Sequence, residues 1–193
     1  MIDLSSDYWT SKYETSNIGW DTGGITTPLQ TYFDQLTDKS LKILIPGCGN
    51  GYEAEYLHKN GFDVTVVDLS DIPLKNLKQR CPSFPEESLI QADFFEFNGA
   101  FDLIIEQTFF SALNPNLRRA YAKKMHELLL PTGKLVGLLF NLELFQDHPP
   151  FGGNLETYKP IFSPYFNFNV FENSHNSIEP RKGNELFMNL TKK

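Results

Sequence analysis

Residues 43–51 read ILIPGCGNG, a short apolar run that passes directly into a turn with three glycines at alternate positions. Such a run is typical of a buried parallel strand, and glycines allow backbone to approach a ligand where side chains would collide. A second apolar run, VTVVD at 64–68, ends at Asp68, about 20 residues on, where a carboxylate can accept hydrogen bonds from ribose hydroxyls. Together the two runs predict a nucleotide-type cofactor site.

The spacing of the glycines narrows the choice of cofactor. Gly47, Gly49 and Gly51 read G-x-G-x-G, whereas the dinucleotide fingerprint reads G-x-G-x-x-G. We therefore favour S-adenosylmethionine over NAD, and a nicotinamide-dependent oxidoreductase stays as the weaker alternative. A strand that merely ends in a glycine-rich turn would explain the glycines but not the acidic residue after the second run.

Composition limits the class of protein. A chain of 193 residues with 40% apolar and 21% charged residues suits one globular domain, residues 1–193. The net charge of -7 disfavours nucleic acid and anionic membranes, because phosphate backbone is bound chiefly by lysine and arginine clusters. We expect a small-molecule partner, a monomer, and a cytoplasmic location, since no apolar run approaches the length of a membrane span and the opening lacks a secretory signal.

Other kinds of site find little support. No set of His, Cys or carboxylate residues has convincing metal-ligand spacing, so no metal is expected. The chain also lacks a G-x-S-x-G elbow, which argues against a hydrolase.

Strand and helix patterns alternate along the chain, which predicts an α/β fold with a parallel sheet. A polar, aromatic arm at 7–27 shows no periodicity and precedes them, and the last two runs read as a hairpin edge after a Pro/Gly-rich loop. We expect strands at 42–46, 63–68, 88–91, 101–106, 134–140, 167–172 and 186–190, and helices at 28–36, 52–59, 72–79, 117–130 and 155–162.

Six short motifs carry a family resemblance: Y-W-x-x-x-Y at 8–13, G-W-D-x-G at 19–23, P-G-C-G at 46–49, V-D-L-S at 67–70, N-P-x-x-R at 114–118 and P-P-F at 149–151. With them the chain resembles class I S-adenosylmethionine-dependent methyltransferases, and more narrowly the thiopurine methyltransferase family with its halide/thiol branch. The likeness runs through almost the whole chain. It implies the Rossmann-like methyltransferase fold, a seven-stranded, mostly parallel sheet with helices on both faces and the last strand reversed.

The resemblance also implies the roles of particular residues. An N-terminal lid, residues 1–27, would cover the cofactor, the glycine turn would pass its methionine part, and the end of the second strand would hold its ribose and flank its adenine. A tryptophan often found in the halide/thiol branch is replaced here by Tyr13. The cofactor-binding residues implied are Trp9, Tyr13, Trp20, Gly47, Cys48, Gly49, Gly51, Asp68, Leu69, Asp93, Phe94 and Gln107.

The segment after the fourth strand separates the branches. Residues 106–113, EQTFFSAL, resemble the F-F-C-A-I run of plant halide/thiol enzymes, whereas thiopurine enzymes tend to have Asp-Arg-Gly-Ser. The tail at 180–183, PRKG, points the same way. The acceptor-binding residues expected are Phe109, Phe110, Arg118 and Phe151, although the three phenylalanines could equally be packing residues and the arginine could face solvent.

We therefore expect methyl transfer from S-adenosylmethionine to a thiol, hydrosulfide or halide, with S-adenosylhomocysteine as the product. No catalytic general base is expected, because the nucleophile can be taken as its anion. Two alternatives stay open: a thiopurine S-methyltransferase-like activity, and a protein that binds S-adenosylmethionine without turnover.

Overall fold

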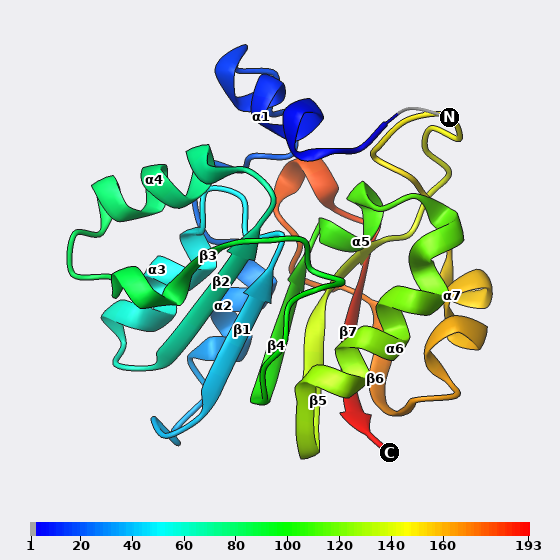
Figure 1. Cartoon of the computed structure of the whole chain (residues 1–193). Coiled ribbons are helices and arrows are strands. Elements are labelled where there is room, and N and C mark those ends of the chain that lie inside the picture. Colours follow the sequence, from blue (N-terminus) through cyan, green and yellow to red (C-terminus); the bar gives the residue numbers. More distant parts are fainter. Residues whose placement is uncertain (1–2) are drawn as a thin grey trace.

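The structure, a computed structural model, describes residues 3–193 and contains one seven-stranded sheet with the order β3-β2-β1-β4-β5-β7-β6 (Figure 1). The neighbouring pairs among the first five strands are parallel, and β7 runs antiparallel to both β5 and β6. The predicted α/β fold with its reversed last strand is therefore confirmed. The strands are β1 Lys42–Pro46, β2 Asp63–Asp68, β3 Leu89–Gln91, β4 Phe101–Gln107, β5 Leu129–Phe140, β6 Phe166–Asn173 and β7 Glu185–Lys192.

Helices cover both faces of the sheet. On one face α2, α3 and α4 contribute to one buried apolar cluster, and on the other α6 and α7 contribute to a second cluster. The α1 helix lies apart, above the carboxyl ends of the parallel strands at the top of Figure 1. The helices are α1 Ser6–Glu14, α2 Thr27–Phe33, α3 Tyr52–Lys59, α4 Asp71–Arg80, α5 Phe109–Ala112, α6 Arg118–Leu128 and α7 Leu155–Phe162, with short 3-10 turns η1 Glu86–Ser88, η2 Pro115–Leu117 and η3 Glu179–Arg181.

The central strand β1 shows why its sequence is continuously apolar. Ile43 and Ile45 pack into the cluster beneath α2–α4, whereas Leu44 packs into the cluster beneath α6 and α7. Successive side chains of a strand point to opposite faces, so a strand covered on both sides needs apolar residues at every position. This arrangement leaves only the ends of the strands free to form a site.

Several predicted elements differ from the structure: the helix expected at 28–36 ends at Phe33, and the short helix α5 was not predicted. The N-terminal arm contains α1, a helix with no buried residue, and a helix without a buried face leaves no apolar periodicity to detect. The helix expected to continue to residue 130 ends at Leu128, because Leu129 already pairs with Phe101 in the sheet. The residues between Leu129 and Lys134 form an irregularity within β5, where the register with β4 shifts.

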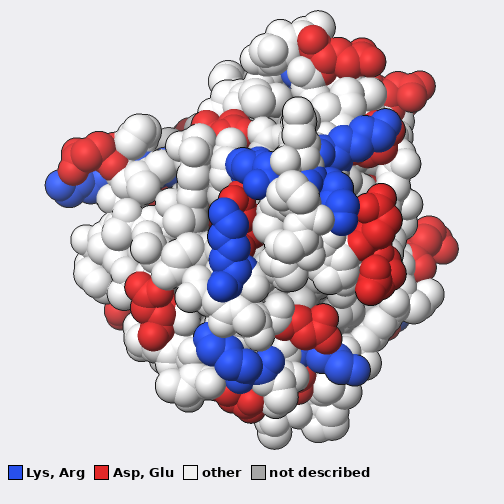
Figure 2. All heavy atoms as spheres, turned by 90° about the vertical axis from the view of Figure 1, so that its left-hand side faces the viewer, with Lys and Arg blue, Asp and Glu red and all other residues white. Residues whose placement is uncertain are grey.

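On the face drawn in Figure 2, acidic and basic side chains lie next to one another, and α3 and α4 carry ion pairs such as Lys59 with Glu55 and Lys75 with Asp71. None of the helices in residues 3–193 has both the length and the apolarity needed to cross a membrane.

Candidate active site

A cavity of about 800 Å³ opens at the carboxyl ends of the central strands, beneath α1. Its walls come from the glycine turn after β1, the end of β2, the loop after β3, the α5 region, and the turn at η3. Open α/β sheets bind ligands at this edge, and the volume suits a ligand of cofactor size with room for a second small molecule.

The glycine turn is shaped by close packing as well as by backbone conformation. Gly47, Gly49 and Gly51 have φ values of 57°, 53° and 68°, in the left-handed region that side chains disfavour. A Cβ on Gly47 would lie 2.2 Å from the ring of Phe109, and a Cβ on Gly51 would lie 2.8 Å from Leu77. The turn therefore presents bare backbone to the cavity.

Asp68 both lines the cavity and supports the turn. Its Oδ2 accepts a hydrogen bond from the Gly49 backbone nitrogen at 3.1 Å, and its Oδ1 accepts one from the Ser70 nitrogen at 3.0 Å. Burial raises the pKa of Asp68 to about 6, although these hydrogen bonds oppose the shift.

The α1 helix is attached to the residues that follow Asp68. The Ser6 hydroxyl donates to the Leu69 carbonyl oxygen, and the Thr10 hydroxyl donates to the Ser70 hydroxyl, both at 2.9 Å. These bonds span some sixty residues of sequence and hold α1 over the cavity.

An aromatic cluster from the N-terminal arm forms the roof of the cavity. The rings of Trp9 and Trp20 meet edge to face at 5.5 Å, and those of Tyr13 and Trp20 meet at 5.7 Å. All three side chains line the cavity, and two of them lie against the glycine turn: a Cβ on Gly49 would be 3.4 Å from the Tyr13 hydroxyl oxygen and 3.9 Å from Trp20 Nε1. Burial raises the pKa of Tyr13 well above its usual range, so its hydroxyl stays neutral.

Much of the remaining wall of the cavity is apolar. Phe109 lines it and packs edge to face on Phe94 at 5.2 Å, and Phe140, Pro149 and Pro150 complete the wall. This apolar part of the wall suits a polarizable, weakly hydrated ligand better than a strongly polar one.

Two cationic side chains, Lys12 and Arg181, line the cavity. Arg181 lines the cavity, donates to the Trp20 carbonyl oxygen at 2.8 Å, and pairs with Glu185 at 3.3 Å. Its guanidinium also lies 5.5 Å from the centre of the Phe140 ring. Arg181 thus joins the C-terminal part of the chain to the roof of the cavity.

A buried carboxylate fixes the position of α5. Glu106 accepts a hydrogen bond from the Phe110 backbone nitrogen at 2.9 Å and a short one from the Tyr121 hydroxyl. Burial raises the pKa of Glu106 to about 7. Because Glu106 faces the core, it orients α5 from behind the cavity wall.

The structure brings most of the predicted cofactor residues together. Asp93 and Leu69 line the cavity together with the arm aromatics and the glycine turn. The cavity lining does not include Cys48, Gly51 or Gln107. Cys48 is buried, and burial raises the pKa of its thiol, so no reactive thiolate forms there. The predicted residues that line it are Trp9, Tyr13, Trp20, Gly47, Gly49, Asp68, Leu69, Asp93, Phe94 and Phe109.

Three predicted acceptor residues lie behind the wall of the cavity. Phe110 is 1% exposed and packs against Tyr158, and Phe151 is equally buried. Arg118 does not face solvent; it lies over the Phe110 ring and donates to the carbonyl oxygens of Phe151 and Gly152. Packing is the role that the structure gives these residues.

Several lining residues were not predicted. Pro149 and Pro150 belong to the P-P-F motif, from which only the phenylalanine was selected, and Arg181 belongs to the P-R-K-G tail that served only to separate the branches. Tyr8 and Lys12 line the cavity from α1, which the sequence pattern did not predict as a helix. The motifs therefore located the site, but not which side chains face it.

The thiopurine S-methyltransferase family profile matches residues 4–189. The chain belongs to this family. Membership confirms the resemblance and makes the chain an S-adenosylmethionine-dependent methyltransferase.

Curated relatives cover most of the chain. It is 31% identical over 184 residues to thiocyanate methyltransferase 1 of Brassica oleracea, covering 92% of this chain and 81% of that protein. Probable thiol methyltransferase 2 of Arabidopsis thaliana is 28% identical, with 96% and 84% covered. A thiopurine S-methyltransferase of Vibrio parahaemolyticus is 25% identical, with 82% of each chain covered.

Solved structures support the fold. An N1-methyltransferase for 1,6-didemethyltoxoflavin from Burkholderia thailandensis superposes with a TM-score of 0.76 at 18% identity, covering 97% of this chain and 87% of that one. Magnesium protoporphyrin IX methyltransferase from Synechocystis also reaches 0.76, at 13% identity, with 100% and 99% covered.

The cavity fits the cofactor that this family uses. Bare glycine backbone, a carboxylate at the end of β2, and a cavity of about 800 Å³ with aromatic walls match an adenosine linked to a charged amino-acid chain. Across residues 3–193 no group of three or more His, Cys, Asp or Glu side chains is arranged to hold a metal ion.

Proposed function

We propose that this methyltransferase acts on a small sulfur nucleophile, a thiol or hydrosulfide, and that halides are taken by the same route. The observation that carries the proposal is the largely apolar wall of the cavity, to which Phe109, Phe140 and Pro149 contribute, with the Arg181 guanidinium 5.5 Å from the centre of the Phe140 ring. A large, polarizable anion is weakly hydrated, so it gives up little hydration free energy when it enters such a site. The names of the plant thiol and thiocyanate relatives agree with this acceptor class.

In this proposal the cofactor lies along the wall that the glycine turn and the arm aromatics form together. Asp68 accepts the ribose hydroxyls, Leu69 and Phe94 flank the adenine, and Asp93 meets its edge. When bound, S-adenosylmethionine supplies a methyl group on a sulfonium sulfur that departs as a neutral thioether. Gln107 lies at the end of β4 but does not line the cavity, so the proposal gives its side chain no contact with the cofactor.

The chain contributes orientation and exclusion of water to the reaction. Alignment of the nucleophile with the methyl group can lower the barrier by up to roughly 7 to 11 kcal/mol. Charge disappears as an anion meets a sulfonium, so the aromatic roof of Trp9, Tyr13 and Trp20 favours the step by removing water. The proposal needs no general base, because a thiol with a pKa of about 8.5 is already partly ionised at neutral pH and a halide is an anion.

We further propose that residues 1–27 act as a lid within a single domain, of which residues 1 and 2 lie outside the described part. The hydrogen bonds of Ser6 and Thr10 to the segment after Asp68 support a closed position of α1. The cytoplasmic, monomeric state expected from the sequence, without nucleic-acid partners, completes the proposal. Light scattering on the purified protein tests the monomer.

A thiopurine acceptor is the second candidate, because the cavity is large enough for a heterocycle beside the cofactor. A product screen by mass spectrometry with thiols, hydrosulfide, iodide and a thiopurine separates the two. We expect methylated thiols and hydrosulfide; methylation of the thiopurine alone would overturn the proposal. Thermal shift with S-adenosylhomocysteine and NAD tests the cofactor, since a ligand at 100 times its Kd adds about 2.7 kcal/mol to the free energy of unfolding.

A further inference from the structure

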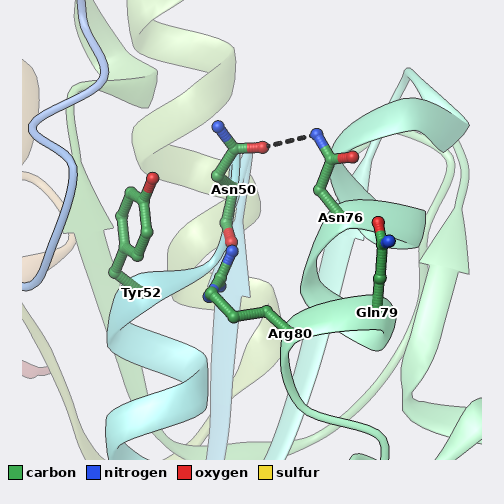
Figure 3. A pocket seen from close by; sticks show the side chains of 5 residues that line it. All are labelled: Asn50, Tyr52, Asn76, Gln79 and Arg80. Carbon is green, nitrogen blue, oxygen red and sulfur yellow. Dashed lines mark hydrogen bonds between the residues drawn. The ribbon is translucent and has the colours of Figure 1, made fainter.

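A second, smaller cavity of about 370 Å³ lies behind the glycine turn (Figure 3). Asn50, the residue between Gly49 and Gly51, lines this cavity and does not line the larger one. Its side chain therefore points away from the cofactor cavity, whereas the backbone on either side of it belongs to the turn. The surroundings of Asn50 decide how firmly the turn is held.

Both ends of the Asn50 amide are occupied. Its Nδ2 donates a short hydrogen bond to Oδ2 of Asp21, and its Oδ1 accepts one from Asn76 Nδ2 at 2.9 Å, drawn as the dashed line in Figure 3. The Asn50 carbonyl oxygen also accepts from Arg80 at 2.5 Å. The turn is thus tied to α4 through Asn76 and Arg80, and to the N-terminal arm through Asp21.

Asp21 in turn fastens the arm to α3. Its Oδ1 accepts hydrogen bonds from the Tyr52 hydroxyl at 3.1 Å and from the Gly23 backbone nitrogen at 2.6 Å. Its Oδ2 accepts the hydrogen bond from Asn50 Nδ2. The preceding residue, Trp20, lines the cofactor cavity, and its indole nitrogen lies 3.9 Å from the position of a Cβ on Gly49. Asp21 therefore contacts Asn50, which supports the glycine turn, and it directly follows Trp20, which lines the cofactor cavity.

The glycine turn needs such support. Two glycines that line the cavity, Gly47 and Gly49, have positive φ, and glycine gains much conformational freedom if the surrounding contacts are lost. A conformation of this kind persists when several contacts determine it together.

We propose that Asp21 is a positioning residue which, through Asn50, holds Trp20 against the glycine turn in the wall of the cofactor cavity. The pair does not line the cofactor cavity; it fixes the position of Trp20 relative to the glycine turn, both of which do. The inference rests on the cofactor placement proposed above, and it concerns affinity for the cofactor independently of the methyl acceptor.

An exchange of the two side chains tests the pair. In Asn50→Asp two carboxylates face each other, so we expect S-adenosylhomocysteine binding to weaken by about tenfold or more. In Asp21→Asn one acceptor oxygen must serve three donors, and we expect a loss of about three- to tenfold. The double variant Asp21→Asn/Asn50→Asp can restore every hydrogen bond, because the amide of residue 21 then donates to the carboxylate of residue 50, which also accepts from Asn76. We expect its affinity to return to within about threefold of wild type.

Calorimetry with S-adenosylhomocysteine, and the melting temperature without ligand, are measured on all variants. Gln79→Ala is the matched control, because Gln79 lines the same cavity while the hydrogen bonds of the pair do not include it. If Asn50→Asp does not fold, Asn50→Ser deletes the amide without adding charge and should weaken binding in the same direction.

The outcomes separate this inference from the proposed function. If the wild type did not bind S-adenosylhomocysteine, the proposed cofactor site itself would be wrong. If the wild type binds and both single variants bind equally well, or if the exchange variant stays as weak as Asn50→Asp, the positioning pair is wrong. Recovery in the exchange variant alone cannot arise from two independent structural roles.

Discussion

The Gly49 backbone nitrogen donates to Asp68 Oδ2 at 3.1 Å, so the carboxylate that ends β2 also holds the middle of the glycine turn. The other oxygen of Asp68 accepts from Ser70, at the start of α4. One side chain thus links the two loops between which we place the cofactor. Its removal should affect both the binding of ribose and the shape of the turn.

Asp68→Ala should weaken binding of S-adenosylhomocysteine by about 2 to 4 kcal/mol, because charge-assisted hydrogen bonds to ribose and to the turn are lost together. Isothermal calorimetry measures the change, and circular dichroism checks that the variant is folded. A folded variant that binds within about twofold of wild type would show that Asp68 has no part in holding the ligand.

The pH dependence of binding should reveal the same group. With the Asp68 pKa at about 6, the carboxylate becomes protonated as the pH falls below 6, and ligand affinity should drop by up to about tenfold per pH unit. The stability of the free protein has the opposite sign: a carboxyl pKa raised from 3.8 contributes stability in acid that is lost as the pH rises through about 6. Asp68→Asn should flatten the binding profile, whereas the stability profile keeps the contributions of the buried Glu53 and Glu106, whose pKa values burial raises to about 7. An unchanged binding profile in that variant would assign the titration elsewhere.

The extent to which sequence predicted the site depends on how local each feature is. The β1 run and the glycine turn follow from adjacent residues, and Asp68 from a strand end, so these were predictable. The α1 helix was not, because its contacts with Leu69 and Ser70 lie sixty residues away in the chain.

The acceptor end shows a second limit. Which phenylalanine faces the cavity depends on Thr108, whose φ is 65°, and on the hydrogen bond from the Phe110 nitrogen to Glu106. These features turn Phe109 toward the cavity and Phe110 into the core. The motif predicts that the two phenylalanines occur together. It does not predict how the short helix α5 is rotated, and this rotation decides which of the two faces the cavity.

Closure of the proposed lid can be measured by tryptic cleavage at one site. Lys12 is the only lysine or arginine before Lys39, and it lies within α1. We expect trypsin to cut after Lys12 readily in the free protein and at least about tenfold more slowly with saturating S-adenosylhomocysteine, because the ligand holds α1 closed. Thr10→Val, which deletes the bond to Ser70, should be cut faster without ligand. Equal cleavage with and without ligand would exclude a lid that the cofactor orders.

Arg118 should matter for stability and for the acceptor, not for the cofactor. Lysine cannot lie flat on Phe110 and donate to two carbonyl oxygens at once, so Arg118→Lys should lower the free energy of unfolding by about 2 kcal/mol. The loop that carries Pro149 would loosen, which should raise the acceptor KM and leave S-adenosylhomocysteine binding unchanged. Arg119→Lys, at the exposed neighbouring position, is the control. A large loss of cofactor affinity in Arg118→Lys would contradict this assignment.

The nature of the acceptor should set the pH profile of the reaction. Since no histidine lines the described cavity and the Cys48 thiol is buried with its pKa raised, we expect the nucleophile to arrive as its anion. At low acceptor concentration the rate with each thiol should then rise with pH and level off near that thiol's own pKa. Iodide, already an anion, should show no such rise, which makes it the internal control for changes in the enzyme. A series of thiols of different acidity, measured with iodide on one preparation between pH 6.5 and about 9.5, separates ionisation of the acceptor from titration of Asp68 at lower pH. If every acceptor, iodide included, followed one common pKa near 6.5, an enzyme group would be titrating and the reaction without a general base would be wrong.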